Sequence, residues 1–272
     1  IMEQHTDLES LVKIFGPTGY EKLIQSHYAN IMKPYVDKIY SDALGNCYAE
    51  ISGDKSLPKV MMNAHADTVG FLVKHIDDRG FVFVMDISGN RNPAVEYNML
   101  PGTNVVIHGR HKDKMVHGHF IPLLPAHHVT DSEELVDRDR LLIDLGVKGK
   151  AFTEEGKKNV EKHINIGDYV VMEPNPRYQQ LNNDYFVSAN LDDRVGLYCM
   201  SRIAKTISKL KSKRRAPIVF VSTVREEDWS GAAGVAAEGV SPQYSITFDV
   251  TAATDTIRGN NEDIVAQKYG NV

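Results

Sequence analysis

The sequence predicts an α/β fold in which a small all-β module interrupts one larger domain. Helix patterns and apolar strand patterns alternate in the first part of the chain and again in the last part. Between them, short strand-like runs are separated by Gly, Asp and Pro, a texture typical of an all-β module. We therefore expect boundaries at 1–69, 70–176 and 177–272. The first and last parts would form one domain, because an insertion is tolerated where chain entry and exit lie close together.

Two helices are predicted at the start of the chain. Thr6 and Glu9 form a capping-box pattern, and apolar residues at helical spacing follow it: Leu8, Leu11, Val12 and Phe15. Gly16-Pro17 ends this helix. Thr18 and Glu21 repeat the capping pattern and predict a second helix through about Met32.

Strands follow in each part. We predict strands at 47–51 and 59–63, then in the β module at 71–76, 81–87, 104–108, 115–120, 140–144 and 169–173. The module also contains one helical pattern near 153–163, and Pro174-Asn175-Pro176 is its predicted exit. The last part should contain a helix at 193–210, a strand at 218–223, a helix at 231–237 and a strand at 244–250.

Composition argues against several function classes. The net charge is −5, so the chain has no overall basic charge for nucleic acid or an anionic membrane. We interpret the basic end of the predicted helix 193–210 as a solvated helix end rather than a nucleic-acid patch. Cys47 and Cys199 are the two cysteines, which fits a reducing, cytoplasmic location. No apolar run approaches the roughly 18 residues of a membrane span.

The first chemical motif is Asn63-Ala64-His65-Ala66-Asp67 at the end of an apolar strand. Residues two apart on an extended chain face the same side, so Asp67 can fix the tautomer of His65 for metal binding. The alternative is a buried histidine whose ring is satisfied by a neighbouring acid. A second pair, Asp192-Asp193, lies at a strand-to-helix junction. One carboxylate can bridge two metal ions while the other caps the helix; the alternative is a helix cap and a surface salt bridge.

Two further acidic positions follow predicted strands. Glu226, Glu227 and Asp228 come directly after the apolar strand 218–223. One glutamate could bind a metal while the other removes a proton from metal-activated water; the alternative is an ordinary charged loop. Asp249 lies inside an apolar run, where a buried carboxylate needs a strong partner such as a metal, a helix cap or a salt bridge. Together these residues form the ligand set of two divalent ions roughly 3.5–4 Å apart.

These motifs, together with Gly16-Pro17-Thr18-Gly19-Tyr20-Glu21, resemble the tetrahedral aminopeptidase family, which includes glutamyl and deblocking aminopeptidases. The resemblance runs from about Leu8 to Asp255. It implies a phosphorylase/hydrolase-like catalytic domain with a mixed sheet and an inserted β domain. It also implies a homo-oligomer, for example a dodecamer, that cleaves the N-terminal residue from short peptides with a free amino terminus. Neither a nucleic-acid partner nor a membrane is expected.

The resemblance also implies metal-binding roles. His65 and Asp249 would bind one ion, Glu227 would bind the second, and Asp192 would bridge both; the ions would be zinc or cobalt.

The resemblance further implies a general base and a residue that orients the histidine. Glu226 would act as the general base, and Asp67 would orient His65. These two residues complete the catalytic assignment that the resemblance gives.

Two departures keep alternatives open. The family's fifth ligand is a histidine near its C-terminus, whereas the last histidine here is His163, so we expect a partial or truncated sequence. The alternatives are a catalytically impaired paralogue acting as an oligomeric scaffold or peptide binder, and a related two-metal deacylase. The stretch Asp228-Trp229-Ser230 also departs from the family pattern, and Asp228 could weaken substrate binding or be a harmless loop residue. Trp229 is interpreted as a packing residue.

A histidine-rich stretch in the β module is a weaker candidate for a second metal site. We favour partly exposed histidines there, because no carboxylate or cysteine spacing supports a site. The six residues are His108, His111, His117, His119, His127 and His128.

Overall fold

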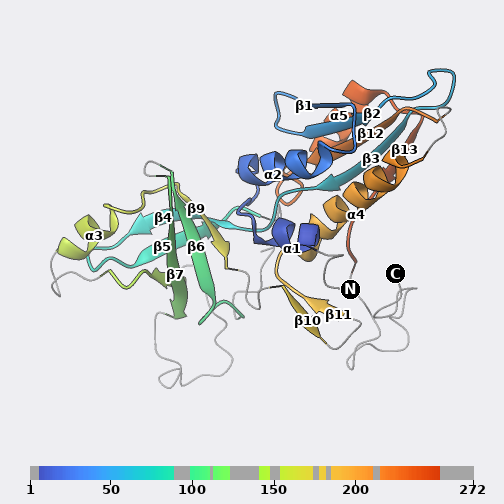
Figure 1. The fold of residues 1–272 in the computed structure, drawn as a ribbon. Coiled ribbons are helices and arrows are strands. Elements are labelled where there is room, and N and C mark those ends of the chain that lie inside the picture. Colours follow the sequence, from blue (N-terminus) through green and yellow to red (C-terminus); the bar gives the residue numbers. More distant parts are fainter. Residues whose placement is uncertain are drawn as a thin grey trace, which may run out of the picture.

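The computed structural model describes residues 6–88, 99–110, 113–122, 141–147, 154–173, 178–181, 185–210 and 215–251 (Figure 1). A helix-covered mixed sheet lies at one end of the molecule and a closed barrel of strands at the other. The predicted α/β class with a mixed sheet and an all-β insertion is therefore confirmed. No helix among the described residues is long and apolar enough to cross a membrane.

The mixed sheet joins strands from both ends of the chain. Its order is β1-β2-β12-β3-β13, with antiparallel pairing from β1 to β12 and parallel pairing from β12 to β13. The three parallel strands end at the same edge, and His65 lies opposite Thr223 in the register. The strands are β1 (Lys38–Ser41), β2 (Cys47–Ile51), β3 (Val60–His65), β12 (Ile218–Thr223) and β13 (Tyr244–Thr247).

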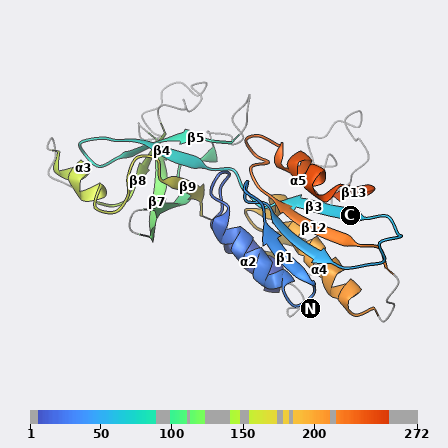
Figure 2. The same cartoon turned by 90° about the horizontal axis from the view of Figure 1, so that it is seen from above.

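Helices cover both faces of this sheet (Figure 2). Side chains alternate between the faces because successive residues of a strand point in opposite directions. Ala49 and Phe220 pack toward one core cluster, which contains residues of three helices, whereas Tyr48 and Val221 pack with the helix on the other face. The first face is covered by α1 (Thr6–Lys13), α2 (Lys22–Met32) and α4 (Leu191–Ser208), and the second by α5 (Ala232–Val240).

The barrel closes in the order β4-β5-β8-β7-β6-β9, with β9 pairing back to β4. Its core includes an edge-to-face contact between Phe71 and Phe120, whose ring centroids lie 5.4 Å apart. A separate hairpin, β10 (Gln179–Leu181) and β11 (Tyr185–Val187), precedes α4. The barrel elements are β4 (Phe71–Ile76), β5 (Val82–Asp86), β6 (Asn104–Gly109), β7 (Lys114–Pro122), β8 (Leu141–Asp144), α3 (Glu155–Val160) and β9 (Tyr169–Met172).

Aromatic residues connect the barrel to the segment that precedes α2. The Tyr20 ring lies 5.1 Å from the rings of both His108 and Tyr169, and Phe15 lies 5.7 Å from His108. The Tyr169 hydroxyl donates a hydrogen bond of 3.2 Å to the carbonyl of Gly19. The segment 15–20 therefore contacts the barrel directly.

Several local predictions differ from the structure. The capping box at Thr18 is wrong, because α2 begins at Lys22 after the N-cap Glu21, which makes no side-chain cap bond. Strands β1, β10 and β11 were not predicted; β1 has four residues, and β10 and β11 have three each. Strand β13 ends at Thr247 rather than at residue 250. The predicted module exit, Pro174-Asn175-Pro176, lies outside the described residues.

Candidate metal centre

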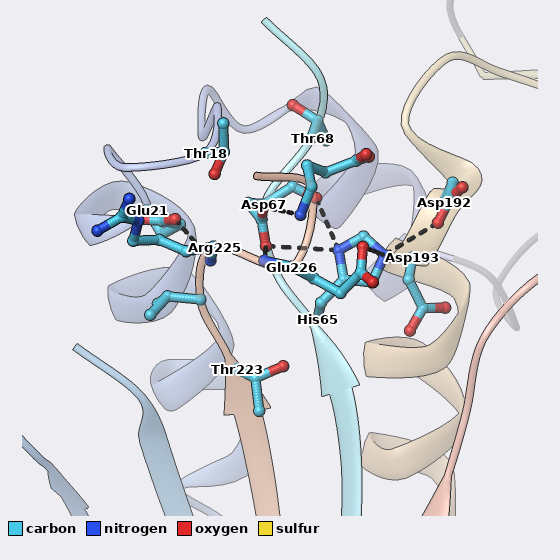
Figure 3. A network of polar contacts seen from close by, with 12 residues as sticks. Thr18, Glu21, His65, Asp67, Thr68, Asp192, Asp193, Thr223, Arg225 and Glu226 are labelled. Carbon is cyan, nitrogen blue, oxygen red and sulfur yellow. Dashed lines mark hydrogen bonds and ion pairs between the residues drawn. The ribbon is translucent and has the colours of Figure 1, made fainter. Parts of the chain in front are cut away.

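Acidic side chains from four segments meet at the carboxyl edge of the parallel strands. Figure 3 shows His65, Asp192, Asp193 and Glu226 at this edge. β3 ends at His65, Glu226 and Glu227 follow β12, and Asp249 follows β13. The N-terminus of α4, which packs on β3, brings Asp192 and Asp193 to the same place. The peptide bond between those two residues is cis. Ligand sites in open α/β sheets form at this edge because loops from neighbouring strands converge there.

His65 is 4% exposed and its two ring nitrogens face different groups. Nδ1 lies 3.1 Å from the backbone oxygen of Asp67 and 3.5 Å from its carboxylate. Because a carbonyl oxygen only accepts hydrogen bonds, the neutral ring carries its proton on Nδ1 and has its lone pair on Nε2. Nε2 lies 3.0 Å from Asp192 Oδ1 and 4.0 Å from Glu226 Oε2. This nitrogen therefore points at the acidic cluster.

The ligand atoms form two groups that share His65. One group is His65, Asp192 and Glu227, and the other is His65, Asp193 and Asp249; within each group the candidate atoms lie within 4.8 Å of one another. Together, the two groups contain the four residues that we predicted as metal ligands. Asp193, which we expected only to cap α4, is a member of the second group. It does accept a hydrogen bond of 3.0 Å from the amide of Gly196.

The charges of these side chains fit divalent cations. Asp193 is fully buried, and its Oδ2 has no hydrogen-bond partner among the residues that the structure describes. Burial, together with the nearby carboxylates of Asp249 and Asp192, raises the pKa of Asp193 to about 7. Burial and the charge of Asp192 likewise raise the pKa of Glu227 to about 7. A divalent cation would offset both the burial and the repulsion, so the residues fit such ions.

The carboxylates around His65 also act on the charge of its ring. Burial disfavours the charged ring, but the carboxylates of Asp192 and Asp67 outweigh it and raise the pKa of His65 to about 11. The imidazolium therefore neutralises part of the cluster charge. A cation bound at Nε2 would replace that proton.

Asp67 contacts more than the histidine. It is fully buried, and its two carboxylate oxygens each accept a 3.0 Å hydrogen bond, from the amides of Glu226 and Glu227. Burial would raise the pKa of Asp67, but His65 and these two amides outweigh it and lower the pKa. Asp67 thus holds both the histidine and the backbone of the turn that carries the two glutamates.

Glu226 has a partly exposed side chain near the histidine. Ser230 donates hydrogen bonds to its carbonyl oxygen at 2.9 Å and to its Oε1 at 3.1 Å. The other carboxylate oxygen, Oε2, faces His65. Sequence reasoning did not single out Ser230, and a hydroxyl four residues after an acid is too common a pattern to reveal this contact.

The position of Asp249 differs from the expectation in one respect. Its side chain is exposed rather than buried, and β13 is exposed along its described length. The strand pairs with β3 on one side and is the last strand in the sheet order. The apolar run around Asp249 therefore does not bury it among the described residues.

Both carboxylate oxygens of Asp228 have partners outside the candidate ligand groups. Thr18 donates a hydrogen bond of 2.8 Å to its Oδ1, and the Arg225 guanidinium lies 2.6 Å from its Oδ2. Its charge is therefore paired within the turn. Trp229, expected to pack, is 47% exposed.

The histidine-rich stretch does not form a ligand group among the described residues. His108 is buried, lies 3.2 Å from Asp113 and contacts Tyr20. His117 Nδ1 lies 3.7 Å from a carboxylate oxygen of Glu173. His111, His127 and His128 lie outside the described residues.

Residues 45–270 match the model of the M42 glutamyl aminopeptidase family. The chain belongs to this family. M42 membership implies divalent metal ions, in agreement with the acidic cluster around His65. The expected resemblance to the tetrahedral aminopeptidases is confirmed.

Individual M42 relatives and solved structures resemble most of the chain. A lysyl aminopeptidase of Pyrococcus furiosus is 30% identical over 251 residues, which cover 90% of this chain and 66% of that protein. The structure of an aminopeptidase from Desulfurococcus kamchatkensis superposes with a TM-score of 0.84 at 27% identity, covering 97% of this chain and 67% of the other. The TET1 peptidase of Pyrococcus horikoshii shares the fold, with a TM-score of 0.75 at 22% identity, 94% coverage of this chain and 72% of the other. The chain spans about two thirds of its lysyl aminopeptidase relative.

Proposed function

We propose that this protein is a metal-dependent aminopeptidase that removes N-terminal residues from short peptides. The observation that carries the proposal is the pair of ligand groups sharing His65, with Glu226 Oε2 4.0 Å from His65 Nε2. The M42 match and the name of the Pyrococcus furiosus relative support the same reaction class.

The proposed site holds two divalent ions, zinc or cobalt. His65 and Asp249 would bind one ion, Glu227 would bind the other, and Asp192 would bridge them. Asp193 is added as a ligand of the first ion because its candidate atom lies in the same group and its buried Oδ2 has no hydrogen-bond partner within the described part of the chain. Bound ions would polarise the scissile carbonyl and lower the pKa of the attacking water.

The chain's own groups would perform the proton transfer. Glu226 would accept the proton from water through Oε2 while Ser230 holds Oε1. Asp67 would keep His65 in the tautomer that offers Nε2 to the ion, and it would fix the turn that carries both glutamates. Glu226 would then donate that proton to the leaving amine, which completes the hydrolysis.

The remaining proposals concern organisation. We propose that the barrel is a separate domain inserted into the catalytic domain, with boundaries near 70 and 176. A homo-oligomer is proposed because the structure of the TET1 peptidase is described as a tetrahedron or a large octahedral shell. A cytoplasmic location is supported by the free cysteines Cys47 and Cys199.

The activity test uses the full-length protein and short peptides with free or acetylated N-termini. We expect release of the first residue from the free peptides, loss of release with a chelator, and recovery on adding zinc or cobalt. Equal cleavage of acetylated peptides would point instead to a deacylase or another amidase. Peptide binding without turnover at saturating metal would support the scaffold alternative.

Replacing the proposed base tests the catalytic assignment. Glu226→Gln should lower kcat by about 100- to 10,000-fold, because the amide cannot accept the proton. Zinc binding measured by calorimetry should change little, since Glu226 is not in either ligand group. Full activity of this variant would show that another group is the base.

A further inference from the structure

The segment 16–21 contains a buried acid that the proposed reaction does not use. Glu21 is 7% exposed and lies between the sheet edge and α2 (Figure 3). It precedes the first residue of α2, yet its side chain makes no cap bond to that helix. Its contacts instead run to the loop that follows β12, 204 positions later in the sequence.

One oxygen of Glu21 accepts two backbone hydrogen bonds. The amide of Gly19 lies 2.8 Å from Oε1, and the amide of Arg225 lies 3.0 Å from the same atom. The next two amides, those of Glu226 and Glu227, go to Asp67. Three successive N–H groups of the turn 225–227 are therefore bound by two buried carboxylates.

The conformation of Arg225 makes its amide bond important. Its φ is 58°, a left-handed conformation that residues other than glycine rarely adopt. Such a conformation persists when the surrounding contacts hold it. Without Glu21, the amide of Arg225 would lose the acceptor that the described contacts provide.

The same N-terminal segment also holds the other end of the turn. Thr18 donates to Asp228, and Asp228 is paired with the Arg225 side chain. The backbone of this segment is also bound to the loop after β3, because the Thr18 amide donates a hydrogen bond of 3.0 Å to the Thr68 carbonyl. The segment 16–21 thus connects the loop that follows His65 with the turn that carries the two glutamates.

We propose that Glu21 is a positioning residue that places Glu226 and Glu227 by holding the amide of Arg225. This proposal rests on the proposed function for its kinetic part, since Glu226 is the proposed base and Glu227 a proposed ligand. The required property is an acceptor oxygen at the distance of Oε1, rather than a negative charge.

Four variants of the full-length protein separate acceptor from charge. Glu21→Gln retains an oxygen at the Oε1 position, whereas Glu21→Met has similar length and no oxygen acceptor. Glu21→Asp keeps the charge but shortens the side chain by one methylene group, which moves its oxygens away from the amide of Arg225. Lys22→Met is the matched control, because Lys22 is the exposed neighbour of Glu21.

Hydrogen exchange of a peptide spanning residues 224–229 is the readout that does not depend on activity. We expect faster exchange in Glu21→Met and Glu21→Asp, and wild-type exchange in Glu21→Gln and Lys22→Met. The kinetic readout should follow the same order. In Glu21→Met, kcat should fall about 10- to 100-fold with KM nearly unchanged, because a shift of about 1 Å in a catalytic group has effects of this size.

The exchange measurements test the role of Glu21 independently of the aminopeptidase activity. Unchanged exchange in Glu21→Met and Glu21→Asp would overturn the proposal. A second outcome would also show the proposal to be wrong. If exchange of residues 224–229 were as fast in Glu21→Gln as in Glu21→Met while Glu21→Asp kept the wild-type exchange rate, the turn would require the charge rather than the acceptor. If Glu21→Met did not fold, the comparison of Glu21→Gln with Glu21→Asp would decide alone. Absence of turnover in the wild-type protein would contradict the proposed function and leave the exchange test intact.

Discussion

At the scale of single residues, the centre depends on side chains that hold other side chains. Asp67 and Ser230 belong to neither group of candidate ligands. They nevertheless hold His65, Glu226 and the backbone of the turn that carries Glu226. Such partners control the orientation of ligands and bases, and reactivity depends strongly on that orientation.

Ser230 offers a test at this scale. Ser230→Ala removes the donor to Glu226 Oε1, so we expect kcat to fall about 3- to 10-fold with KM unchanged. Ser241→Ala is a matched control. Ser241 is also exposed, has a positive φ and donates to a carbonyl three residues earlier. Equal kinetics for the two variants would show that Ser230 does not orient the base.

At the scale of elements, the start of α4 is shaped around Asp193. A methyl group at Gly196 would lie 2.5 Å from both carboxylate oxygens of Asp193. Gly196→Ala should therefore displace this carboxylate and weaken zinc binding, measured by calorimetry, about 10-fold or more.

Gly234 in α5 is the matched control for Gly196. Apart from its chain neighbours and the backbone of its own helix, no described atom lies within 4 Å of a methyl group at Gly234. Gly234→Ala should leave zinc binding unchanged and raise the free energy of unfolding by about 0.5–1 kcal/mol, because alanine is the better helix former. Wild-type zinc affinity in Gly196→Ala would argue against Asp193 as a ligand.

The turn between β1 and β2 links stability to pH through Asp42. Its carboxylate accepts hydrogen bonds from the amides of Leu44, Gly45 and Asn46, and from the side chains of Asn46 and Tyr48. Burial alone would raise the pKa of Asp42, but these donors outweigh it and lower the pKa. The stabilisation is therefore complete above the unfolded pKa of about 3.9 and is lost as the pH falls through the folded value.

Denaturant unfolding of Asp42→Asn measures this contribution. At pH 7 we expect a free energy of unfolding lower than wild type by about 1–2 kcal/mol, because the amide presents a donor to Asn46 and Tyr48. The difference should stay constant down to about pH 5 and narrow below about pH 4. Glu238→Gln, an exposed change of the same charge, should show no such trend. A difference that persists undiminished at pH 3.5 would contradict the assignment.

At the scale of the whole molecule, aromatic contacts around Tyr20 join the barrel to the segment that precedes α2. Glu21 directly follows Tyr20 in the sequence and accepts a hydrogen bond from the amide of Arg225, in the turn that carries the proposed base Glu226.

Tyr20→Ala tests the barrel contact. We expect faster hydrogen exchange in β6 and β9, little change in β12, and a free energy of unfolding lower by about 2 kcal/mol through loss of ring packing. Tyr244→Ala is the control, since Tyr244 is 62% exposed on β13. Unaltered exchange in the barrel would show that other contacts fix its position.

The sequence by itself determined the fold class, the longer elements and the acidic residues at the strand ends. These features follow from local signals: apolar periodicity, turn residues, and carboxylates placed where an apolar run stops. The match of β4 to its predicted bounds and the convergence of His65 with Asp192 and Glu227 reflect those signals.

Only the tertiary structure decided the partners of these residues. Thr18 and Glu21 follow a capping pattern, yet they bind Asp228 and Arg225, more than 200 positions away. Asp193 is a candidate ligand because it is buried and one of its oxygens has no hydrogen-bond partner in the described ranges. The short strands β1, β10 and β11 arise from pairing rather than from a clear periodicity. Such contacts depend on how distant loops meet at one sheet edge, and a local pattern carries no information about that meeting.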